Sequence, residues 1–234
     1  MARRPARKAA RSSRKPAAPA TDRAKIITAF LDLLGEKRIE DIGLSEIAQE
    51  AGVSLAQLRG EFNSTLAILA AHIKDIDRAV LAEDVSGLDD EPVRERLFDV
   101  LMRRLEILAP HRAAVRSLMR SASRNPPLAL ALNALAVRSQ QWMLTAAGIE
   151  ASGPRGMLRA QGLALLFGSV LRTWIVDDED PGLARTMAAL DRALNRGQRF
   201  AGLLDDLCYI PSRLCRMRSR RRRRSEDSEG SAAA

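Results

Sequence analysis

The stretch LSEIAQEAGVSLAQLRGEF, residues 44–62, decides how this chain is interpreted. It reads as two short helices, from residue 44 to about 51 and from 55 to about 61, joined by a sharp turn. Gly52 permits that turn because glycine adopts positive φ without steric cost, and Ser54 can cap the second helix. Leu58 and Phe62 are expected to anchor the second helix. Its N-terminal residues are then left free to enter a DNA major groove.

The flanking segments complete a small helical head. Apolar residues at helical spacing predict a first helix from Thr21 or Asp22, and a long helix is expected from about Ser64 to Glu83. Its inner face is expected to carry Leu66, Leu69, Ile73, Ile76 and Val80. An ordinary pair of packed helices is the alternative reading. The position of the stretch between these two helices favours a helix-turn-helix. The predicted DNA-binding residues are Lys25, Leu44, Ser45, Ser54, Leu55, Ala56, Gln57, Arg59 and Thr65.

The remainder of the chain predicts an all-α protein. Helices are expected near 92–108, 110–123, 126–147, 154–176 and 181–196, with Pro110, Pro127 and Pro181 at helix starts. The predicted organisation is a disordered basic arm at 1–20, a DNA-binding domain at 21–83, a ligand-binding and dimerisation bundle at 90–197, and an amphipathic, basic tail at 198–234. A polar loop near 86–92 is the expected boundary between head and bundle.

Charge is concentrated at the two ends of the 234-residue chain. The net charge is +9. Residues 1–25 carry +8, residues 213–224 carry another +8 and residues 225–234 carry −3, which leaves −4 for residues 26–212. Basic tails of this kind bind polyanions or stay solvated. The C-terminal arginine run is therefore expected to meet an anionic membrane or a nucleic acid, with the choice between them left open.

The sequence resembles the TetR family over residues 22–83. The resemblance rests on Ile47-Ala48, Ala51-Gly52-Val53-Ser54, Leu58, Phe62, Ser64 and Leu69. It implies a homodimer that binds double-stranded DNA as a repressor and is released from DNA by a small apolar or cationic effector. The chain departs from the pattern at Arg59, Gly60 and Glu61, where aromatic residues are usual, and at Thr65, where a phosphate-binding lysine is usual. Arg59 can replace a lost contact, whereas Glu61 would repel phosphate.

A softer resemblance covers most of residues 92–196. Segments such as RRLEILAPHRAAVRSL are similar to a TetR-like branch that includes the accessory protein of ubiquinone biosynthesis. This implies a bundle that holds an isoprenoid lipid and a terminal helix that touches membrane. A lipid-binding accessory protein is thus the alternative function. Trp142 and Trp174 are either core or interface residues or the lining of an apolar effector pocket. The candidate pocket residues are Met102, Leu105, Met119, Trp142, Met143, Phe167, Leu171 and Trp174.

The remaining chemistry-bearing residues favour no catalytic or metal site. Cys208 and Cys215 are expected to be free thiols in a reducing, cytoplasmic compartment. His72 and His111 are expected to be isolated at helix surfaces or ends, and the acidic run 177–180 is expected to be a solvated turn. No cofactor, metal or enzymatic activity is predicted. No apolar run is long enough for a membrane span.

Overall fold

Every regular element in the described part of the chain is helical. The structure, a computed structural model, describes residues 21–82, 91–177 and 182–197, and these ranges contain no strand. The elements are α1 (Asp22–Glu36), η1 (Ile39–Asp41), α2 (Leu44–Glu50), α3 (Leu55–Glu61), α4 (Thr65–Ala82), α5 (Val93–Leu108), η3 (Ala109–His111), α6 (Arg112–Ala122), α7 (Pro126–Ala146) and α8 (Gly153–Trp174). Residues 184–197 are also helical. The all-α prediction is confirmed.

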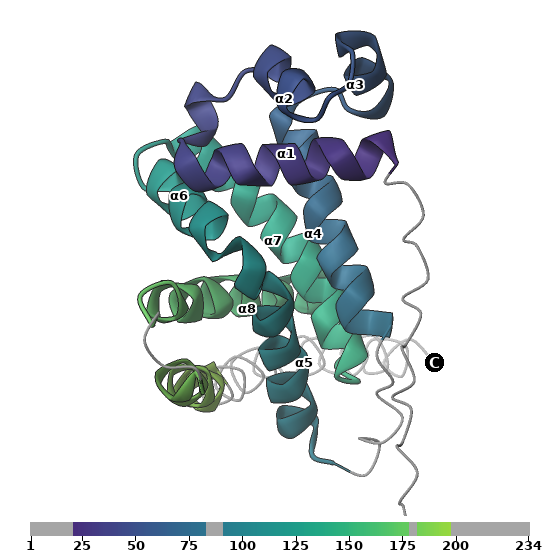
Figure 1. The fold of residues 1–234 in the computed structure, drawn as a ribbon. Helices are drawn as coiled ribbons and strands as arrows, with labels where there is room; N and C mark the ends of the chain where they lie inside the picture. Colours follow the sequence, from purple (N-terminus) through teal and green to yellow (C-terminus); the bar gives the residue numbers. More distant parts are fainter. Residues whose placement is uncertain (1–20, 83–90, 178–181, 198–234) are drawn as a thin grey trace, which may run out of the picture.

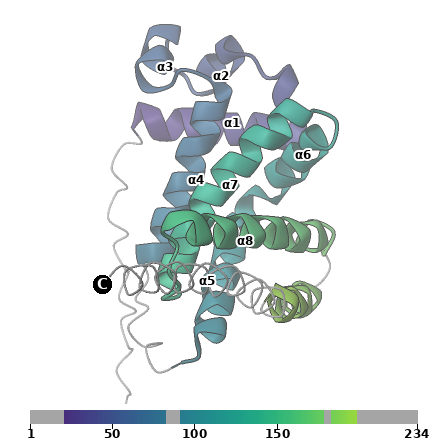
Figure 2. The same cartoon turned by 180° about the vertical axis from the view of Figure 1, so that it is seen from behind.

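Helices α1, α2 and α3 form a head at one end of the molecule, and α4 runs from this head along the bundle (Figures 1 and 2). The head closes around an apolar cluster to which each of its helices contributes. Phe30 of α1 and Ile47 of α2 are fully buried, and Leu58 of α3 is 2% exposed. The apolar residues whose helical spacing predicts α1 are all buried, namely Ile26, Ile27, Phe30, Leu33 and Leu34. Hydrophobic burial therefore fixes the relative positions of the three short helices.

The head's core also includes part of the chain beyond the loop expected to divide the molecule. Ala114 of α6 belongs to the head cluster, with Leu118 of the same helix and Leu128 and Leu132 of α7 packed against it. The hydroxyl of Ser117 on α6 donates to the backbone oxygen of Lys37 at 2.5 Å. Helix α6 is thus held directly against the head.

A second cluster forms the core of the bundle. Helices α5, α7, α8 and residues 184–197 supply most of it, with Leu101, Leu105, Met143 and Trp174 among its fully buried members. Helix α4 contributes Ile76 and Val80, so this helix takes part in both cores. Of its five predicted inner residues, Leu69, Ile76 and Val80 are buried and Leu66 and Ile73 are partly buried.

Local chemistry sets where several helices begin. Thr21 caps α1 by accepting from the backbone N–H of Ala24, and Ser54 caps α3 as predicted. Gly52 has φ of +64°, which confirms that the turn before α3 uses the left-handed region. Helix α7 starts at Pro126, one residue before the predicted Pro127, because Asn125 supplies its cap. Pro110 lies in the short η3 turn, so α6 begins later than expected.

A buried ion pair joins α4 to the bundle. The carboxylate of Asp77 contacts the guanidinium of Arg104 on α5, and the hydroxyl of Ser139 on α7 donates to the same carboxylate at 2.6 Å. Asp77 is 8% exposed and Arg104 is 5% exposed. The Arg104 guanidinium also lies 5.8 Å from the ring centre of Phe167 on α8. One polar cluster therefore links four helices.

The acidic run 177–180 was expected to be a solvated turn, and for Asp177 this is wrong. Asp177 is 3% exposed, and its carboxylate accepts from both the backbone N–H and the hydroxyl of Thr186. The side chain therefore satisfies donors at the start of helix 184–197, as an N-terminal cap does. Residues 178–180 lie outside the described residues.

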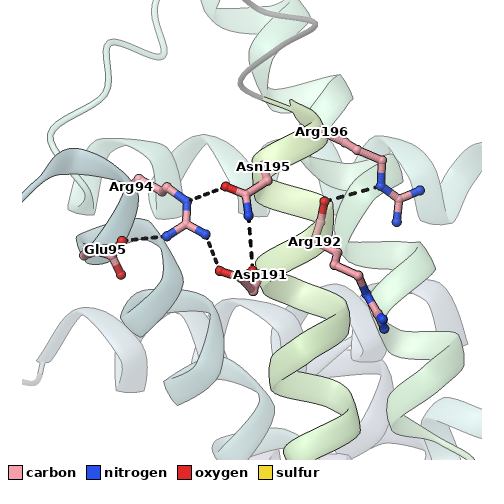
Figure 3. A network of polar contacts seen from close by, with 6 residues as sticks. All are labelled: Arg94, Glu95, Asp191, Arg192, Asn195 and Arg196. Carbon is pink, nitrogen blue, oxygen red and sulfur yellow. Dashed lines mark hydrogen bonds and ion pairs between the residues drawn. The ribbon is translucent and has the colours of Figure 1, made fainter.

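The same helix is held near its other end by α5. Figure 3 shows the guanidinium of Arg94 between the carboxylates of Glu95 and Asp191, with Asn195 completing the network. Arg94 donates to the side-chain oxygen of Asn195 at 3.2 Å, and Asn195 donates to Asp191 at 3.1 Å. Helix 184–197 is thus attached to the bundle at both ends.

The two histidines were expected to be isolated, and this is also wrong. The rings of His72 on α4 and His111 on η3 pack edge to face with their centres 4.9 Å apart. His72 is only 9% exposed. The pKa of His72 is lowered to about 4, chiefly by burial and also by positive charge on His111 and Arg104, while Asp75 opposes the shift. Burial likewise lowers the pKa of His111.

This pairing predicts a loss of stability in mild acid. Below pH ~6.5 the unfolded chain binds a proton at His72 that the folded chain does not bind, so the unfolding free energy falls as the pH drops from ~6.5 to ~4. The expected loss is up to about 3 kcal/mol, measured by urea unfolding across this range. His72→Leu should flatten the profile. An unchanged slope in this variant would contradict the assignment.

Candidate DNA-binding surface and effector-binding bundle

Helix α3 presents most of its surface to solvent. Of its seven residues only Leu58 is fully buried, while Phe62 just beyond its end is 7% exposed. Leu55 is 55% exposed, and Ser54, Ala56, Gln57 and Arg59 are exposed as well. The anchoring roles predicted for Leu58 and Phe62 agree with these positions. An outward helix on a rigid head has the geometry needed to enter a major groove.

Gln57 fixes the start of α3 through hydrogen bonds that were not predicted from the sequence. Its side-chain oxygen accepts from the backbone N–H of Ser54 at 2.8 Å, while its own N–H donates to the Ser54 hydroxyl, which makes a capping box. Its side-chain nitrogen donates to the carboxylate of Asp22 on α1 at 2.9 Å. The Ser-x-x-Gln spacing is a known signature of the box and was visible in the sequence. Contact with a base by Gln57 would require these bonds to rearrange.

The other predicted DNA-binding residues lie on four different helices, α1 to α4, with different surroundings. Arg59 is exposed and donates to the side chain of Asn63 one turn later. Leu44 and Ser45 are exposed at the start of α2, and Thr65 is half-buried at the start of α4. Lys25 lies on α1, exposed and 3.1 Å from the carboxylate of Asp22. Phosphate could reach most of these positions without unfolding the head.

The described head is acidic. Residues 21–82 hold seven lysines and arginines against ten aspartates and glutamates, a net charge of −3. Most of the basic side chains have carboxylate neighbours, in the pairs Arg23–Asp75, Lys25–Asp22, Lys37–Glu46, Arg38–Glu40 and Arg78–Asp75. The head by itself therefore offers little net attraction for a DNA backbone.

Six of the eight candidate effector-pocket residues belong to the bundle's apolar core or pack against it. Leu105, Met143 and Trp174 are fully buried, Phe167 is 5% exposed, and Met102 and Leu171 pack against the same cluster. The structure does not place Trp142 with them, because this residue is 55% exposed on the outer side of α7. An indole at that position fits the interface alternative and not an enclosed pocket.

Met119 lies on a separate hollow of about 390 Å³. The hollow lies where the end of α6, the first turns of α7 and the end of α8 meet. Its lining residues are Arg116, Met119, Arg120, Ala122, Ser123, Ala129, Arg172 and Ile175.

Residues 21–82, 91–177 and 182–197 contain neither a candidate metal site nor a candidate membrane-spanning helix. No group of three His, Cys, Asp or Glu side chains in these ranges could hold a metal ion. No helix in them is both long and apolar enough to cross a bilayer. Cys208, Cys215 and the arginine run 213–224 lie outside the described residues.

Comparison with known proteins identifies solved structures with a similar fold. No family model and no curated protein matches the sequence. Among solved structures, the chain is similar to a TetR transcriptional regulator from Nitrosomonas europaea, with a TM-score of 0.58 and 22% identity over 75% of this chain and 97% of the other. It is also similar to a TetR transcriptional regulator from Rhodococcus sp. RHA1, with a TM-score of 0.54 and 22% identity over 76% and 94% of the two chains.

The chain therefore has the TetR regulator fold, with an N-terminal helix-turn-helix head and a C-terminal helical bundle. The predicted fold class is confirmed. The resemblance of the bundle to the accessory protein of ubiquinone biosynthesis finds no support in these comparisons.

Proposed function

We propose that this protein is a DNA-binding transcriptional regulator whose α3 reads a half-site in the major groove. The observation that carries the proposal is the exposure of α3 on a rigid head: Leu58 is buried, while Leu55, Ala56 and Arg59 face solvent. The similarity to solved TetR regulators supports the same assignment at the level of the fold. Arg59 is the α3 side chain best suited to contact guanine or phosphate.

The proposal includes repression that a small hydrophobic effector relieves. The bundle supports this part because α4 takes part in both cores, through Ile68 and Leu69 on the head side and Ile76 and Val80 on the bundle side. A ligand that changes the packing of the bundle would therefore displace a helix that also holds the head. A contact of the arginine run 213–224 with nucleic acid or membrane remains a separate prediction.

The function is tested by mapping the DNA that the protein occupies in cells and comparing Ala56→Glu with Ala79→Glu. Both alanines are exposed, but Ala56 lies in the first turn of α3 and Ala79 lies near the end of α4. A glutamate in a first turn favours the helix while it repels phosphate, so the head should stay folded. We expect discrete sites for the wild type and Ala79→Glu and none for Ala56→Glu. Equal occupancy by both variants would contradict the role of α3.

A homodimer is part of the proposal, and the outer faces of α7 and α8 are the surface we assign to it. Large apolar side chains stand exposed along both helices: Leu130, at 72%, and Trp142, at 55%, on α7, with Leu158, at 53%, and Leu165, at 64%, on α8. The side-chain amides of Asn133 and Gln161 hydrogen-bond to each other at 2.9 and 3.0 Å and hold these helices together. An apolar surface of this kind marks a protein interface.

Leu165→Glu is expected to convert the dimer into a monomer. Burying an added carboxylate at an apolar interface costs more than the lost leucine contact, so the dimer Kd should rise at least about a hundredfold. Sedimentation velocity measures the change. Leu81→Glu on α4 is the matched control, since Leu81 is also exposed, at 37%, but lies on another helix. Retention of the dimer in Leu165→Glu would place the interface elsewhere.

A further inference from the structure

Helix α6 has two faces with different neighbours. Ala114, Ser117 and Leu118 point toward the head, where they join its apolar cluster or bond to its backbone. Arg116, Met119 and Arg120 belong instead to the lining of the hollow between α6, α7 and α8. The same helix thus forms part of the head's core and one wall of an open site.

The composition of the hollow is both apolar and basic. Met119, Ala129 and Ile175 supply hydrocarbon, while three guanidinium groups come from Arg116, Arg120 and Arg172. A volume of about 390 Å³ lies within the range of small-molecule sites, which are mostly apolar with a few polar groups that orient the ligand.

Two of the three arginines of the hollow, Arg120 and Arg172, have no ion-pair partner among the described residues. Arg116 donates to the backbone oxygen of Ile175, which fixes one guanidinium at the rim. Arg120 and Arg172 are exposed, and no carboxylate of residues 21–82, 91–177 or 182–197 forms an ion pair with either.

The positions of Arg120 and Arg172 at helix C-termini explain only part of why two arginines lie on this hollow. Arg120 lies in the last turn of α6 and Arg172 in the last turn of α8, where a cation interacts favourably with the terminal carbonyl groups. That explains why each arginine is tolerated alone. The like charges of Arg120 and Arg172 on one hollow repel each other, and a bound anion would replace this repulsion with charge-assisted hydrogen bonds.

We propose that this hollow binds an anionic amphiphile. Its carboxylate or phosphate head would lie between Arg120 and Arg172, and its alkyl part would cover Met119, Ala129 and Ile175. The claim that this ligand is the effector rests on the proposed function. The claim that the hollow binds it rests on the described residues alone. This inference replaces the effector expected from the sequence, a small apolar or cationic compound, with an apolar compound that carries an oxyanion.

The test is isothermal titration calorimetry on the full-length, DNA-free protein with three ligands of equal chain length: decanoate, decyl phosphate and decanol. We expect both anions to bind at least ten times more tightly than decanol, and the tighter anion identifies the preferred head group. The double variant Arg120→Ala, Arg172→Ala should lose at least tenfold in anion affinity. Arg124→Ala is the matched control, because Arg124 is exposed just beyond α6 and does not line the hollow.

Equal binding of decanoate and decanol would overturn the proposal, as would an equal loss in Arg124→Ala or no binding of either anion. Because the titration contains no DNA, a failure here leaves the DNA-mapping result unaffected. A protein that binds these anions but occupies no DNA would instead contradict the proposed function while leaving the site in place.

Discussion

Deletion of residues 2–20 will lower the affinity of the protein for duplex DNA by at least about a hundredfold at low salt. The reason is the distribution of charge. The folded head, residues 21–82, has a net charge of −3, while residues 1–20 carry seven lysines and arginines and no acidic residue. The phosphate attraction that a DNA-binding protein needs must therefore come mainly from the arm. Each phosphate contact that is lost also removes about one unit from the slope of log K against log salt concentration.

Fluorescence anisotropy with a random duplex, measured over a range of salt concentrations, gives both quantities. A variant that keeps the arm's length but replaces its seven basic residues with serine separates charge from chain length. Deletion of residues 213–224 is the second control, since it removes a net charge of +8 from the other end of the chain, against +7 for the arm. An unchanged salt slope in the arm deletion would show that the head binds phosphate without the arm.

Asp77→Ala is expected to destabilise the fold by about 3–5 kcal/mol. The substitution leaves the guanidinium of Arg104, which is 5% exposed, without its carboxylate, and it removes the acceptor of the Ser139 hydroxyl. A buried charge without its partner keeps the full cost of desolvation. Chemical denaturation measures the loss, and the double variant Asp77→Ala, Arg104→Leu should recover much of it because no charge is then left buried.

Asp75→Ala supplies the control for this prediction. Asp75 lies two residues earlier on α4 and pairs with Arg23 at 2.8 Å, but the side chains of both are about a third exposed. Exposed pairs contribute only about 0–1 kcal/mol, so this variant should stay close to the wild type. Equal effects of Asp75→Ala and Asp77→Ala would show that burial does not determine the contribution of the ion pair.

Features set by neighbouring residues could be predicted from the sequence. The turn at Gly52, the cap at Ser54 and the apolar spacing of α1 depend on residues a few positions apart, and the structure places them as expected. The exposure of the predicted DNA-binding residues of α3 follows from the same local pattern.

Features that depend on distant residues were missed. The bond from Gln57 to Asp22 spans 35 positions and that from Arg104 to Asp77 spans 27, so no local spacing predicts the partner. A partial signal existed for the second pair, because Asp77 follows Ile73 by four positions within the inner face of α4. A charge on an apolar face indicates a buried partner without identifying it. The packing of α6 against the head's core could not be predicted from the sequence, since alanine, as at Ala114, is small enough for a buried or an exposed position.

The bond between Gln57 and Asp22 also decides where the basic arm starts. It holds the first turn of α1 beside the first turn of α3, so the chain before residue 21 is tethered next to the helix proposed to read the bases. Twenty residues extend to at most roughly 70 Å, which corresponds to about twenty base pairs along a duplex. Because the arm begins at this point, its basic residues can contact phosphates only within that distance of each half-site. Phosphate contacts farther along the duplex would have to come from another part of the protein.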